Sequence, residues 1–387
     1  MAFSAENRKG TISGIIFVAI FAAAATMIAG LAPIKALGIS PLVIGIVMGI
    51  FYANTLHQHI PIEWETGITF SGKKILRFAI VFYGFRITFQ QIMAVGLSGF
   101  TVSVIMLTTT FLLGTYLGIK VFKMDRDTSM LTAAGGAVCG AAAVLATEPV
   151  LEAEGHKTAV AVSMVVLFGT ISMFLYPVLY TTIIENATGF LHMTPEQFGI
   201  YTGGTIHEVA QVVAVPASIP TSTIHDTIMV GGVAMSPEAL HAQMANSAVI
   251  VKMTRVILIA PMLIVLGLYL SMQAKKAGGE GNGLTLTIPW FAVYFVGMAG
   301  FYSVLVTYFG LKADTLSSTA VLLNSIIGNI NQVDTFLLTM AMTALGMGTI
   351  FSKFKGLGLA PLYTAGSMFV WLVVGGFIVT KAVTAIL

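Results

Sequence analysis

Apolar runs of about 20 residues recur along the chain, and short polar connections separate them. A run of that length crosses about 30 Å of hydrocarbon as a helix, and a helix satisfies its own backbone hydrogen bonds where water is absent. The pattern therefore predicts an all-α polytopic membrane protein with about nine to eleven transmembrane helices. Nine spans are expected, at Thr11–Leu31, Pro41–Asn54, Lys74–Val95, Ser98–Gly118, Thr158–Tyr180, Ala242–Met272, Ile288–Phe309, Asp334–Phe351 and Ala360–Leu387.

Two more apolar segments, Thr128–Glu152 and Pro195–Val215, are interrupted in the middle by glycines. The first contains Gly135–Gly136 and Gly140, and the second contains Gly203–Gly204. Paired glycines permit a sharp break with positive φ. A half-helix that begins after such a break can present free N–H groups to an anion. We expect these half-helices to begin after Gly136 and after Gly204.

Positive charge favours a re-entrant path for both broken segments, because Lys and Arg collect on the cytoplasmic side of a membrane. With the N terminus inside, re-entrant segments leave Lys35 and Lys312 as the basic residues of the outer loops. Spanning segments would move Lys157 outside and weaken the bias. The cytoplasmic loops then carry Lys73, Lys74, Lys120, Lys123, Arg126, Lys157, Lys275, Lys276, Lys353 and Lys355.

Internal repeats are a feature of many carriers, and two are visible in this sequence. A slide of 262 residues matches Leu76, Ala79, Gly84, Phe89, Gly96 and Leu97 with Leu338, Ala341, Gly346, Phe351, Gly358 and Leu359. A slide of 68 residues matches Gly135, Gly136, Ala142, Val144 and Ala146 with Gly203, Gly204, Ala210, Val212 and Ala214. The matched glycines fall at the expected breaks, which favours two broken segments that enter from opposite faces. We expect one integral membrane domain, residues 1–387, with halves over about residues 10–180 and 195–387.

The composition agrees with a membrane protein and excludes several other classes. Hydrophobic residues make up 57% of the chain and charged residues 9%, far from the roughly 25% charged residues of soluble domains. The single cysteine, Cys139, excludes an internal disulfide. A net charge of +3 gives nucleic-acid binding no support. No metal or cofactor is expected.

Signatures of enzymes are absent from the sequence. His207–Glu208 is not the H-E-x-x-H zinc motif, because position 211 is Gln. No G-x-x-x-x-G-K-[ST] phosphate loop occurs, so ATP is not expected to drive transport. We therefore expect a protein that is not an enzyme.

The most polar stretch inside an apolar segment is Gly203–Val213. Polar groups at membrane depth are costly and usually mark a site. His207 and Gln211 share a helix face at i, i+4, with Glu208 beside them. The candidate substrate-binding residues here are Gly204, Thr205, His207, Glu208 and Gln211. The alternative is a polar break in a buried helix, with its groups hydrogen-bonded to neighbours.

Two basic residues, Lys252 and Arg255, lie near the middle of an expected span and three residues apart. Cations at that depth need a partner, and we expect either a fixed acid such as Glu208 or a bound anion. A buried ion pair that orients the helices and an anion site are both open. Arg86, at a glycine break, and the Cys139–Gly140 break complete the candidate set.

Other polar groups have a simpler interpretation. Asn324, Asn329, Asn331 and Asp334 are expected to cap a helix that starts near Asp334, with a solute pathway as the alternative. The loop with His225, Asp226 and Glu238 is expected to be a solvated outer loop rather than a lid. Gly278–Gly283 is expected to be a flexible linker.

Five stretches together resemble one family over nearly the full length of the chain. They are Lys74–Gly96 (KILRFAIVFYGFRITFQQIMAVG), Cys139–Pro149 (CGAAAVLATEP), Gly203–Val213 (GGTIHEVAQVV), Asn246–Pro261 (NSAVIVKMTRVILIAP) and Asp334–Gly346 (DTFLLTMAMTALG). The chain is similar here to the YeiH family of bacterial inner-membrane proteins, often labelled sulfate exporters. The resemblance implies a multi-pass secondary carrier of the bacterial plasma membrane, with inverted repeats and broken helices.

Three functional hypotheses follow. The first is a secondary transporter that exports a small anion, sulfate- or sulfite-like or an organic sulfonate, with His207 or Glu208 carrying a coupling proton. The second is a cation- or proton-coupled carrier of another organic solute, with Glu208 and Asp334 as ligands of the cation. The third is a membrane-embedded sensor or enzyme using Cys139 and His207. The expected partners are a small-molecule anion and the lipid bilayer, and a homodimer stays open.

Overall fold

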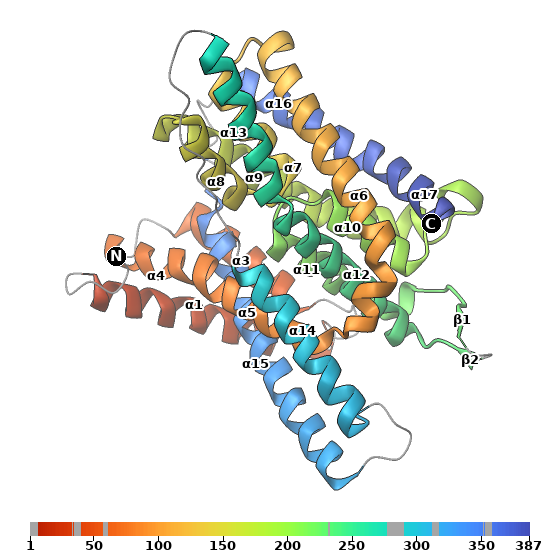
Figure 1. Ribbon diagram of the computed structural model, residues 1–387. Coiled ribbons are helices and arrows are strands. Elements are labelled where there is room, and N and C mark those ends of the chain that lie inside the picture. The colour runs from red at the N-terminus through yellow and green to blue at the C-terminus, as the bar shows by residue number, and fades with distance from the viewer. Residues whose placement is uncertain are drawn as a thin grey trace. The chain divides into compact units, whose positions relative to one another are not determined.

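A computed structural model describes residues 7–32, 34, 40–56, 61–230, 233–276, 290–311, 317–350, 352 and 358–387, and it is helical almost throughout (Figure 1). The predicted all-α fold class is confirmed, since the strands among these residues amount to one antiparallel pair, β1 (Met229–Val230) and β2 (Val233–Ala234). The expected linker Gly278–Gly283 lies outside the described residues. Five described helices are long and apolar enough to cross a membrane: Arg8–Ala29, Phe89–Val121, Gly155–Ile184, Pro237–Met272 and Leu359–Ile386.

The chain divides into two compact units that interleave along the sequence. Unit 1 contains Met1–Ala94, Val213–Ala242 and Phe291–Ser352, and unit 2 contains Val95–Val212, Gln243–Trp290 and Lys353–Leu387. Each unit therefore takes segments from both expected halves.

Unit 1 is built mainly from five elements and their short extensions. They are α1 (Arg8–Ala29), α3 (Pro41–Thr55), α4–α5 (Glu65–Phe70 and Leu76–Tyr83, joined by a π turn at Ser71–Ile75), α14 (Trp290–Phe309) and α15 (Ser318–Gly348). Single 3₁₀ turns lie at Ile62–Trp64, Gly84–Arg86 and Thr221–Thr223.

Small residues set how closely the helices of unit 1 pack. A Cβ on Gly49 of α3 would come 2.8 Å from the Met347 nitrogen of α15, and one on Gly14 of α1 would come 2.8 Å from the Gly67 Cα of α4. Both are inside normal contact distance, so side chains there would force the helices apart. A core of Val18, Ala22, Tyr52, Ile68, Met340, Ala344 and Met347 fills the space between these helices.

Unit 2 holds the two broken segments. Its complete helices are α7 (Arg126–Ala137), α8 (Ala141–Leu151), α9 (Gly155–Leu179), α10 (Pro195–Thr205), α13 (Ile259–Lys276), α16 (Leu359–Val370) and α17 (Gly376–Ile386). The unit boundaries fall within α6 (Phe89–Tyr116), α11 (Val209–Ala217) and α12 (Pro237–Ile257), and after the first residue of α14. π turns follow α6, α9 and α16 at Leu117–Val121, Tyr180–Ile184 and Trp371–Gly375, and a 3₁₀ turn lies at Gly189–Leu191.

The chain reverses direction between α7 and α8. A Cβ on Gly135 of α7 would lie 2.7 Å from Cγ2 of Val144 in α8. In a continuous helix, residues nine apart would be separated by about 13 Å along the axis. The first broken segment therefore folds back as a helical hairpin, and its core packs with α9 and α13 through Leu131, Val144, Ala161, Val165 and Leu266.

Two predicted boundaries are wrong, and local caps explain both. The expected break near Gly96 lies inside α6, which begins at Phe89. The Gln91 side chain accepts a hydrogen bond from the Thr88 backbone N–H at 2.9 Å, while the Thr88 hydroxyl accepts one from the Gln91 N–H, so Thr88 caps α6.

The second error concerns α15. This helix begins at Ser318 with Ser317 as its cap, and it runs through Asp334 instead of starting there. The asparagines before Asp334 therefore do not cap a helix, which corrects that expectation.

Candidate functional site

The two interruptions occupy equivalent places in the two broken segments. α7 ends at Ala137 and α8 begins at Ala141, whereas α10 ends at Thr205 and α11 begins at Val209. The slide of 68 residues carries the end of α7 onto the end of α10 and the start of α8 onto the start of α11. The breaks are therefore Val138–Gly140 and Ile206–Glu208, and each begins two residues after the paired glycines that were expected to make it.

The glycines divide between two structural tasks. Gly140 has φ +76°, and a Cβ there would lie 2.5 Å from Cγ of Glu208, so the turn and the contact both require glycine. Gly203 is helical, and a Cβ there would meet the α12 backbone at Ala248 and Cβ of Val251 at 2.9 Å. The second pair thus permits close packing of α10 on α12 instead of a break.

Lys252 of α12 joins the two interruptions. It is 0% exposed, and its ammonium donates to the carbonyl oxygens of Val138 at 2.7 Å, Ile206 at 2.7 Å and His207 at 2.6 Å. An ammonium has three N–H donors, so these carbonyls use them all. Its partners are backbone groups at the ends of α7 and α10, which the sequence did not indicate.

Arg255, one helical turn further along α12, makes the same kind of connection. It is 0% exposed and donates to the carbonyl oxygens of Gly204 at 2.7 Å, Gly136 at 3.3 Å and Ala137. The last carbonyls of a helix lack intrahelical partners and carry partial negative charge. Both cations therefore neutralise the carboxyl ends of both first half-helices.

The second half-helix, α11, begins with a cap made by two predicted site residues. The Gln211 side-chain oxygen accepts a hydrogen bond from the Glu208 backbone N–H at 3.1 Å, as in half of a capping box. Glu208 is half-buried at the cap position, and its Oε1 lies 3.1 Å from the Cβ position of Gly140. Its carboxylate thus stands at the amino-terminal ends of both α8 and α11.

Three buried nitrogens at the interruptions have no hydrogen-bond partner among the described residues: Nδ1 of His207, Nε2 of Gln211 and Nε of Arg255. His207 is 3% exposed and Gln211 is 0% exposed. The Gln211 and Arg255 nitrogens can only donate, whereas a neutral imidazole nitrogen can donate or accept. Each of the three nitrogens can therefore donate one further hydrogen bond.

Thr205 and Cys139 have mainly structural surroundings. The Thr205 hydroxyl donates to the Tyr201 carbonyl at 2.6 Å and accepts from the Tyr176 hydroxyl at 2.9 Å, while the two tyrosine rings stack at 4.8 Å. Cys139 is buried within the first break. Nine of the ten predicted site residues are in unit 2, within the two breaks, on the helix ends beside them or on α12.

Arg86, the tenth, belongs to unit 1. Its guanidinium donates to the Asp334 carboxylate at 3.0 Å, to the Asn331 carbonyl at 2.8 Å and to the Thr335 hydroxyl at 2.8 Å. The guanidinium also lies over the ring of Tyr83, 4.9 Å from its centroid. This pair ties the turn after α5 to the middle of α15.

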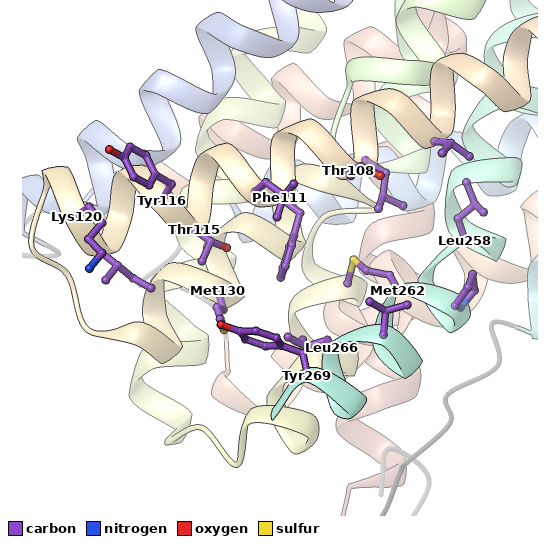
Figure 2. A pocket seen from close by; sticks show the side chains of 16 residues that line it. Thr108, Phe111, Thr115, Tyr116, Lys120, Met130, Leu258, Met262, Leu266 and Tyr269 are labelled. Carbon is purple, nitrogen blue, oxygen red and sulfur yellow. The ribbon is translucent and has the colours of Figure 1, made fainter. Parts of the chain in front are cut away.

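A cavity of about 660 Å³ lies apart from these groups, along α6 and α13 (Figure 2). Its lining is apolar apart from a few threonine and tyrosine hydroxyls and the Lys120 ammonium, and it contains none of the ten predicted residues. Size alone therefore does not identify the polar site. The buried polar groups of the candidate set lie instead at the two interruptions and on α12.

A helical chain with several apolar spans and a charged centre buried between two broken helices defines a multi-pass membrane protein. The chain matches the family model described as Conserved hypothetical protein 698 over residues 13–365, and it belongs to that family.

Its relatives support the same assignment. It is 45% identical over 381 residues to a UPF0324 membrane protein of Pseudomonas putida, covering 98% of this chain and 96% of that protein. It is 39% identical over 378 residues to the UPF0324 inner membrane protein YeiH of Escherichia coli, covering 97% and 95%. The resemblance noted in the sequence and the inner-membrane location are thereby confirmed.

Proposed function

We propose that this protein is a secondary transporter that exports a small oxyanion, sulfate- or sulfite-like or an organic sulfonate. The observation that carries the proposal is the group of three buried nitrogens at the two interruptions that find no acceptor within the described part of the chain. A buried donor left unsatisfied costs about 1–3 kcal/mol. An oxyanion supplies several acceptors at once and would recover that cost.

The helix ends add to this preference. α8 and α11 both begin at the interruptions, and helix N-termini favour negative charge through free N–H groups and the macrodipole. Polar centres formed by interrupted helices are a common device of secondary transporters. In our proposal, Glu208 or His207 carries a coupling proton. The outward direction rests on the family resemblance.

The test is solute counterflow in proteoliposomes, with labelled sulfate, sulfite and methanesulfonate offered separately. The informative variant is Gln211→Glu, which keeps an oxygen to cap α11 but replaces the free Nε2 donor by an acceptor. We expect anion flux to fall at least about tenfold, equivalent to about 1.4 kcal/mol, with little change in thermal stability.

Gln91→Glu is the matched control, because Gln91 makes the same cap at the start of α6. It should leave flux unchanged. If the wild-type protein moves none of the three anions, the proposal is wrong.

A second candidate is favoured by one observation. Six backbone carbonyls take up the hydrogen bonds of Lys252 and Arg255, so both cations fit the role of fixed counter-ions in a carrier of an organic solute coupled to a cation or proton. Flux that depends on Na⁺ and is not inhibited by oxyanions would favour this candidate over the first.

A further inference from the structure

We propose that the site accepts solutes with a single net negative charge, and that the Glu208 carboxylate sets this limit. This inference rests on the proposed anion transport. It is argued from the net charge of the helix ends and charged side chains at the two interruptions.

The carboxyl ends of α7 and α10 carry negative charge and bind the two cations. Each contributes about half a negative charge, and their carbonyls hold the Lys252 ammonium and the Arg255 guanidinium. Two full positive charges thus face about one negative charge, so this side of the site retains about one positive charge.

The amino ends of α8 and α11 carry positive charge and lie beside the Glu208 carboxylate. Each contributes about half a positive charge. The Glu208 carboxylate stands at both, as the cap residue of α11 and in contact with Gly140, the cap residue of α8. It also acts electrostatically on Lys252. One negative charge therefore balances the two helix ends together.

With His207 neutral, the sum over these groups is about one positive charge. Uncompensated charge is expensive where water is scarce. A monoanion would neutralise the site, whereas a dianion would leave an excess negative charge beside Glu208. Because Glu208 is half-buried while Lys252, Arg255 and Gln211 are fully buried, its carboxylate is the charged group of the site most open to an arriving solute.

The experiment compares methanesulfonate with sulfate by counterflow at pH 7.5, where their charges are one and two. Both are tetrahedral about sulfur, and exchange of like for like moves no net charge across the membrane. We expect the wild-type protein to prefer methanesulfonate by at least about tenfold, which corresponds to about 1.4 kcal/mol.

Glu208→Gln should raise the net charge of the site and shift the ratio of the two fluxes at least tenfold toward sulfate. Glu208→Asp keeps the charge and should keep the wild-type preference, which separates charge from shape. Equal wild-type rates for the two anions, or an unchanged ratio in Glu208→Gln, would overturn the inference and leave anion transport standing. Absence of flux for both anions, and for sulfite as well, would instead reject the proposed function.

Discussion

At the scale of single residues, the partners of Lys252 and Arg255 could not be predicted. Their depth and their shared helix face follow from spacing in an apolar run. The groups that they bind are carbonyl oxygens of Val138, Ile206 and Gly204, and every residue has such an oxygen. The residue types do not show which backbone carbonyls lack a partner at a helix end. An acid or a bound anion was therefore expected as the partner of the two cations.

Replacement of Lys252 should show how much the two breaks depend on it. Lys252→Met removes the ammonium and leaves three buried carbonyls without their donor, each bond to a charged group being worth about 1.5–3 kcal/mol. We expect a loss of at least about 3 kcal/mol of stability, measured as a lower thermal midpoint of the purified protein in detergent. Lys73→Met, at an exposed lysine, is the control. Equal midpoints for the two variants would contradict the role given to Lys252.

At the scale of elements, caps decided which boundaries were predicted. The Thr194–Gln197 capping box starts α10 one residue after Thr194, at the predicted broken segment. The Thr88–Gln91 pair has the same T-x-x-Q spacing and was missed, because the expected span Lys74–Val95 included these polar residues within one membrane crossing. The paired glycines led to a different error. They predict a break in the helix, whereas Gly203 lies within α10 and allows it to pack closely on α12.

The contact of α10 with α12 can be tested by adding one methyl group. Gly203→Ala should push α10 away from the Ala248 carbonyl and the Val251 side chain, at a cost of about 1–3 kcal/mol. Gly297→Ala is the matched control, since a Cβ on this helical glycine meets nothing within 4 Å. It should be neutral or stabilising by up to about 1 kcal/mol. Thermal unfolding of both variants measures the difference, and a stable Gly203→Ala protein would exclude tight packing at this position.

At the scale of the whole molecule, the spans and the repeat of the broken segments were visible in the sequence, and the interleaving of the two units was not. Apolar runs tell which segments are buried in membrane or protein, without telling which helix packs on which. The pairing of α3 with α15 in unit 1 depends on close contacts such as Gly45 with Thr343, and nearly 300 residues separate these positions in the chain. The folding back of α7 onto α8 likewise depends on a packing contact, that of Gly135 with Val144, which the sequence pattern does not show.

That reversal has a consequence for topology that labelling can test. α7 is 12 residues long, about 18 Å as a helix, whereas a span needs about 30 Å. The residues before α7 and after α8 should therefore lie on the same, cytoplasmic side.

Cys139→Ser leaves no cysteine in the chain, so single cysteines at Lys123, Glu154 and Thr188 can be labelled in right-side-out and inside-out vesicles with a membrane-impermeant maleimide. Lys123→Cys and Glu154→Cys should react in inside-out vesicles. Thr188→Cys lies beyond the span Gly155–Ile184, so it should react in right-side-out vesicles. Reaction of the first two from opposite sides would mean that α7 and α8 together span the membrane.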